Sequence, residues 1–186
     1  MFNELYNDEE VFRSFENLSK NNNILQNDLL NILKKFAKTI SVFDLMIATA
    51  ILKDDGKYVQ VQYREKFLEV YIKYFIMRIK EIKENNNTYT KNINKVEYIE
   101  SIDLLRKQFK KDRQNERKES RFPLIYALCS MYATYILKEP IHPVGTPFPG
   151  DLKVEEKNGI YYCPVKEKQE DNPNAVCKLC IAKQSK

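Results

Sequence analysis

Apolar residues recur at spacings of three and four positions through most of the first 138 residues, as in helices that bury one face. Asparagine triplets at residues 21–23 and 85–87 interrupt the pattern. It predicts an α-helical bundle over residues 1–138, with about six helices at residues 7–18, 27–37, 42–53, 59–84, 95–118 and 123–138. The third and sixth are apolar around nearly their whole circumference, so we expect both to lie at the centre.

Polar residues mark two of the helix starts. Asn7 and Glu10, and again Ser41 and Asp44, are three positions apart, the spacing at which two side chains cap the free N–H groups of a helix. The first helix is expected to bury the apolar residues of one face, namely Val11, Phe12, Phe15 and Leu18.

The chain changes character after Glu139. Six of the seven prolines, three of the four glycines, three of the four cysteines and the single histidine follow it. Asn158-Gly159 separates two short alternating runs, which predicts a small β-hairpin. The expected fold class is therefore mainly α, with a Pro/Gly-rich tail at residues 139–186 that packs on the bundle as part of one structural unit.

Composition narrows the classes of function. The 186 residues include only four glycines and one histidine, too few for a glycine-rich phosphate loop or a multi-histidine centre. The two most apolar stretches, residues 42–52 and 122–137, are shorter than the ~20 residues that cross a bilayer. The first ten residues lack the basic and apolar pattern of a secretory signal. We therefore expect a cytoplasmic protein without a membrane partner, whose cysteines stay reduced or bind metal.

Four side chains of the tail are candidate metal ligands: Cys163, Cys177, Cys180 and His142. Zinc favours four thiolate or imidazole ligands, and the Cys177-x-x-Cys180 spacing lets one tight turn supply two of them. Zinc is the predicted cofactor. An iron–sulfur cluster is the first alternative, and free or redox-active thiols are the second. For His142, stacking on an aromatic ring or capping a backbone carbonyl competes with ligation, whereas Cys129 is expected to be an ordinary core residue.

Basic residues concentrate between Arg106 and Arg121. This segment contains eight basic and three acidic residues, so its net charge of +5 equals that of the whole chain. Helical geometry places four on one narrow face, namely Arg106, Lys110, Arg113 and Arg117. Like charges at this spacing favour an anionic partner such as nucleic acid. A solvated helix end is the preferred interpretation, because no aromatic residues alternate with the basic ones.

Two further arginines, Arg64 and Arg78, fall on the apolar side of the long fourth helix. A buried guanidinium needs a partner because it stays charged. Glu81 is one turn from Arg78 and can provide it, or the two arginines line an anion-binding cleft. Extension of the arginine side chains to the edge of the helix is the preferred interpretation.

Three motifs of the tail occur together: residues 142–150 (HPVGTPFPG), 161–166 (YYCPVK) and the Cys177–Cys180 pair. In this combination the chain resembles an uncharacterised protein family of methanogenic archaea, a domain of unknown function. The resemblance covers about the last quarter of the chain. It implies an anaerobic, reducing cytoplasm, which keeps an iron–sulfur cluster among the alternatives, and it implies no particular activity.

These observations favour a metal-binding protein in which a structural zinc site holds the tail on the bundle, and which presents a surface to a macromolecular or anionic partner. One alternative is an enzyme whose metal or cluster keeps an open coordination position for an anionic substrate. Another is a nucleic-acid-binding protein that uses the basic helix. No catalytic residue is predicted.

Overall fold

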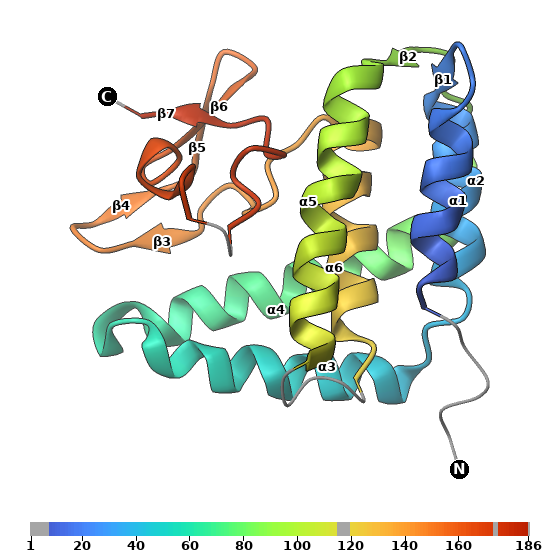
Figure 1. The fold of residues 1–186 in the computed structure, drawn as a ribbon. Coiled ribbons are helices and arrows are strands. Elements are labelled where there is room, and N and C mark those ends of the chain that lie inside the picture. Colours follow the sequence, from blue (N-terminus) through green and yellow to red (C-terminus); the bar gives the residue numbers. More distant parts are fainter. Residues whose placement is uncertain (1–7, 115–119, 173–174, 186) are drawn as a thin grey trace.

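The computed structural model describes residues 8–114, 120–172 and 175–185 (Figure 1). Within these ranges the chain forms six α-helices, which confirms the mainly helical class. The helices are α1 (Glu10–Ser19), α2 (Gln26–Ala37), α3 (Val42–Asp55), α4 (Val61–Glu84), α5 (Lys95–Gln114) and α6 (Phe122–Met131). Between them lie a 3-10 turn, η1 (Gly56–Tyr58), and two short paired strands, β1 (Ile24–Leu25) and β2 (Asn92–Ile93). The predicted start at Asn7 lies outside the described residues.

The helix α6 is the centre of the bundle. It contacts α2, α3, α4 and α5, and all its residues except Tyr126 are buried. Figure 1 shows α1, α2, α5 and α6 running side by side, with α3 crossing their lower ends. The prediction of a buried sixth helix is thus confirmed. No helix in the described part of the chain combines the length and the apolarity needed to cross a bilayer.

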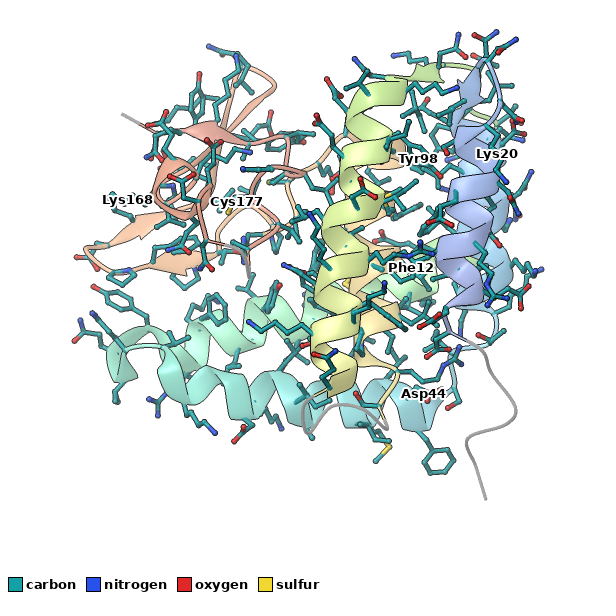
Figure 2. All side chains as sticks on the ribbon, viewed as in Figure 1. Phe12, Lys20, Asp44, Tyr98, Lys168 and Cys177 are labelled. Atoms are coloured by element: carbon teal, nitrogen blue, oxygen red, sulfur yellow. The ribbon has the colours of Figure 1, made fainter. Side chains whose placement is uncertain are left out.

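The first helix buries the face that its sequence predicts. Val11, Phe12, Phe15 and Leu18 are all buried. The ring of Phe12 meets that of Phe109 edge-on, with centroids 5.0 Å apart, and thereby joins α1 to α5. In Figure 2 Phe12 and Tyr98 lie between these two helices.

The prediction that the third helix is central is wrong. Its capping pair is present as expected, since Ser41 and Asp44 each accept a hydrogen bond from the other's backbone N–H. However, α3 lies at the edge of the bundle, where Val42 and Phe43 are 72% and 75% exposed. Its neighbours α4, α6 and η1 cover only part of its circumference. A helix that is apolar all round carries no information about which face is covered.

The last helix changes its hydrogen-bonding pattern before it ends. After Met131 the chain continues as a π-helix, η2 (Tyr132–Leu137), where the sequence predicts continuous α-helix. The backbone N–H of Glu139 bonds to the carbonyl of Ala133 at 2.9 Å, and Lys138 takes a left-handed conformation with φ of 58°. The chain thereby leaves the bundle and turns into the tail.

Three small ladders organise the tail. Its strands are β3 (Pro147–Phe148), β4 (Leu152–Lys153), β5 (Glu155–Lys157), β6 (Ile160–Cys163) and β7 (Lys183–Gln184). The predicted hairpin is confirmed: β5 and β6 pair antiparallel around Asn158 and Gly159, whose positive φ angles of 54° and 74° suit a two-residue turn. The strand β7 pairs in parallel with β6 and returns the chain end to Cys163.

Candidate metal centre

The end of strand β6 places Cys163 at the centre of the tail. Its side chain is buried in a small apolar cluster with Val154 and Ala182. Burial raises the pKa of this thiol, and the backbone N–H groups of Val165 and Lys166 beside the sulfur partly offset that rise. Such donors stabilise a thiolate, because they place positive partial charge against the sulfur.

A second turn presents Cys177 and Cys180 to the same region. The N–H of Cys180 bonds to the carbonyl of Cys177 at 3.2 Å, which closes the turn. Lys166 joins it to the Cys163 turn: its ammonium group donates to the carbonyl of Cys177 and, at 2.7 Å, to that of Cys180. The pairing of β7 with β6 holds the turn beside Cys163.

The three thiols interact electrostatically. The pKa of Cys177 is raised to about 11, chiefly by burial and then by Cys180 and Cys163, because neighbouring thiolates repel. Burial also raises the pKa of Cys163, with Cys180 contributing in the same direction. A cation between the sulfurs would reverse this repulsion, since each thiolate would gain an opposite charge.

The three predicted cysteines therefore lie near enough to influence one another's pKa, although not as a finished ligand set. Within residues 8–114, 120–172 and 175–185, no three His, Cys, Asp or Glu side chains have the arrangement of a metal site. Zinc–sulfur bonds are about 2.3 Å long, so metal binding at the thiols requires the two turns to close on the ion.

The fourth predicted ligand, His142, packs on aromatic rings. Its imidazole lies nearly parallel to Tyr71, with centroids 5.3 Å apart, and edge-on to Phe148 at 5.9 Å. Burial lowers its pKa to about 4. The hydroxyl of Tyr126 bonds to that of Tyr71, and Tyr126, unlike His142, interacts electrostatically with Cys177. The structure therefore does not bring the imidazole to the sulfurs.

The remaining cysteine behaves as predicted. Cys129 is buried in α6, and its sulfur lies 4.0 Å from the carbonyl oxygen of Phe75. Burial raises its pKa well above the ordinary value, so the thiol stays protonated. It is a core residue.

The arginines of the fourth helix already have partners. Arg78 is 13% exposed, donates to Glu81 at 2.6 Å and forms a second ion pair with Glu139 of the tail. Its guanidinium also lies over the ring of Tyr74. Arg64 donates to the carbonyls of Lys57 and Val59 and so closes the turn before α4. Neither geometry supports a shared anion cleft.

The basic segment is only partly described. Arg106 pairs with Glu16 and lies over Phe12, so it belongs to the contact between α1 and α5. Lys110 is exposed. The side chain of Arg113 and the whole of Arg117 lie outside the described residues. Anion binding at this face stays a prediction.

A family model described as "Uncharacterized protein conserved in archaea (DUF2115)" matches residues 25–185. The chain belongs to this family. A UPF0305 protein of Methanothermobacter thermautotrophicus is 36% identical over 155 residues, which cover 83% of this chain and 93% of that protein.

Two further relatives extend the range of methanogens. A UPF0305 protein of Methanocaldococcus jannaschii is 31% identical over 163 residues, covering 84% of this chain and 94% of the relative. One of Methanopyrus kandleri is 39% identical over 87 residues, covering 46% and 61%. No solved structure matches the chain. The expected resemblance to a methanogen family is thus confirmed, and the names of these relatives state no activity.

Proposed function

We propose that Cys163, Cys177 and Cys180 bind one zinc ion, which fixes the fold of the C-terminal tail against the helical bundle. The observation that supports this most is the electrostatic interaction of the three thiols on two turns that Lys166 joins. The two N–H donors to the Cys163 sulfur add support, because they favour the thiolate that a metal needs.

The small core of the tail gives the proposed metal a structural role. In the apolar cluster of the tail, only Val154, Cys163 and Ala182 are fully buried among the described residues. A segment with so little buried apolar surface gains stability from a cross-link. An unfolded tail does not hold the thiols in one place, so it binds zinc less tightly than the folded tail does. Zinc binding therefore stabilises the folded form.

His142 is not included in the proposed ligand set, because its ring is held by Tyr71 and Phe148. The fourth position is assigned to the Glu170 carboxylate, which interacts electrostatically with Cys177. Carboxylate oxygen is an accepted zinc ligand. This assignment predicts that His142→Ala keeps the metal and that Glu170→Gln weakens its binding.

The test is elemental analysis and an anaerobic visible spectrum of the purified full chain. One zinc per chain and a colourless sample support the proposal. Iron with sulfide and a brown colour would show that the site holds an iron–sulfur cluster and not zinc. A metal-free protein that does not take up zinc would overturn the proposed site. Cobalt substitution adds a readout, since thiolate–cobalt bonds absorb strongly in the near ultraviolet.

Matched variants separate metal binding from general loss of stability. Cys163→Ser, Cys177→Ser and Cys180→Ser are expected to abolish stoichiometric zinc. Cys129→Ser is the control: it makes the same chemical change at a buried cysteine in α6, and is expected to lower stability while zinc stays at one per folded chain. Equal zinc loss in the control would contradict the assignment.

A further inference from the structure

A cleft of about 730 Å³ lies between the helical bundle and the tail. Its walls come from α5, from the π-helix η2 and from the turn at residues 178–181. The volume is within the range of small-molecule sites. Cys180 forms part of one wall.

The floor of the cleft offers hydrogen-bond acceptors. Ser101, Thr134 and Tyr135 line it and are buried. Ser101 donates its hydroxyl hydrogen to the carbonyl of Glu97 at 2.7 Å, and Thr134 donates to the carbonyl of Leu179 at 3.3 Å. The hydroxyls of Ser101 and Tyr135 are 2.7 Å apart, so Tyr135 is the donor in this pair when the Ser101 hydrogen is on the Glu97 carbonyl.

In this arrangement all three floor hydroxyls use their donor hydrogens within the protein, and only lone pairs are left. Burial raises the pKa of Tyr135 to about 12, so it stays a neutral hydroxyl at physiological pH. Such a floor satisfies a ligand that brings its own N–H donors, and an ammonium group brings three.

The rim of the cleft holds opposite charges apart. Three carboxylates and three ammonium groups line it: Glu97, Glu100, Asp103, Lys107, Lys138 and Lys178. None of them forms an ion pair with another residue in the part of the chain that the structure describes. Elsewhere exposed lysines do pair with carboxylates, as Lys66 does with Glu69 at 3.1 Å.

Glu97 and Lys138 are near enough to interact electrostatically, yet they do not form an ion pair. The ammonium group of Lys138 lies over the ring of Tyr135, 5.5 Å from its centroid, and neither charge is held in an ion pair, so both can meet a ligand that carries both charges. Leu104, Leu179 and Ile181 add an apolar part to the wall. An aliphatic side chain would remove this surface from water.

We propose that this cleft binds a small zwitterion of the α-amino-acid type, with its ammonium group on the hydroxyl floor beside Glu97 and Glu100. The carboxylate of the ligand pairs with the rim lysines, and its aliphatic side chain covers Leu104 and Leu179. This inference goes beyond the proposed zinc site, because it assigns a ligand to a different set of side chains.

The test is isothermal titration of the full chain, first with L-leucine and then with compounds that each lack one feature. 4-Methylpentanoate lacks the ammonium group, 3-methylbutylamine lacks the carboxylate, and N,N,N-trimethyl-L-leucine keeps both charges without N–H donors. We expect L-leucine to bind with a Kd of about 1 mM or lower, and each comparator at least about tenfold more weakly.

Variants locate the binding. Glu100→Gln changes an exposed rim residue, and Tyr135→Phe removes the floor oxygen, so each is expected to weaken L-leucine binding about tenfold. Glu156→Gln, exposed on β5, is the control that leaves binding unchanged. Because Glu100 is on the surface, its variant tests the cleft even if Tyr135→Phe does not fold. Absence of L-leucine binding at about 10 mM, or equal binding of 4-methylpentanoate, overturns the proposal.

Discussion

Acid is expected to destabilise the protein through His142. Its imidazole packs between Tyr71 and Phe148 and has no hydrogen bond to any residue that the structure describes. Burial therefore favours the neutral ring and lowers the pKa from 6.5 to about 4. In the unfolded chain the ring recovers its ordinary pKa, because water again surrounds it.

The sign and the size of the effect follow from proton linkage. Between the folded pKa of about 4 and the unfolded value of 6.5, the unfolded chain binds the proton and the folded chain does not, so stability falls as pH falls. From about pH 7.5 to about pH 5 this group removes up to roughly 2 kcal/mol from the free energy of unfolding. Below pH 4 the loss is complete, at roughly 3 kcal/mol.

Urea unfolding of the protein and of His142→Phe at these two pH values measures the effect. Carboxylates and thiols titrate in both proteins, so their contributions cancel in the difference between the two. The wild-type protein should lose about 1–2 kcal/mol more than the variant on going to about pH 5. A difference that stays the same at both pH values would show that the ring is not desolvated as described.

Two further predictions compare buried and exposed sites. Phe75, 2% exposed, meets Tyr71 edge-on, so Phe75→Ala should lower the free energy of unfolding by about 3–5 kcal/mol, whereas Phe43→Ala, at a residue 75% exposed, should change it by less than about 0.5. Arg121 holds the buried Asp8 at 2.9 Å, so Arg121→Gln should cost about 3 kcal/mol, against less than about 0.5 for Lys35→Gln at an exposed ion pair. Chemical denaturation measures all four, and equal losses within either pair would contradict the burial argument.

The sequence was sufficient to predict an element of the structure where the local pattern and the tertiary environment agree. The helix α1 has one apolar face, which is removed from water only by packing against the bundle. All four predicted residues of that face are buried. The Ser41–Asp44 pair and the Asn158-Gly159 turn are set by contacts within a few residues, so they could be identified without knowledge of the fold.

The sequence was insufficient where the outcome depends on distant residues. Which side of α3 is exposed depends on where its neighbouring helices lie. The amino-acid sequence of residues 42–55 does not indicate that side, because the helix is apolar all round. His142 stacks on Tyr71 of α4, which lies some seventy positions earlier in the chain. The π-helix has no residue signature, because Tyr132–Leu137 continues the apolar run of α6 without a break.

The site and the core meet in one turn of the tail. Val176 and Leu179 are buried in the main core of the bundle, and the hydroxyl of Thr134 in the π-helix bonds to the carbonyl of Leu179. The two cysteines of this turn flank Leu179, so burial of Leu179 fixes where both thiols lie. Hydrophobic packing thus fixes this turn on the bundle without any metal. A metal at that position would then stabilise the tail without having to locate it on the bundle.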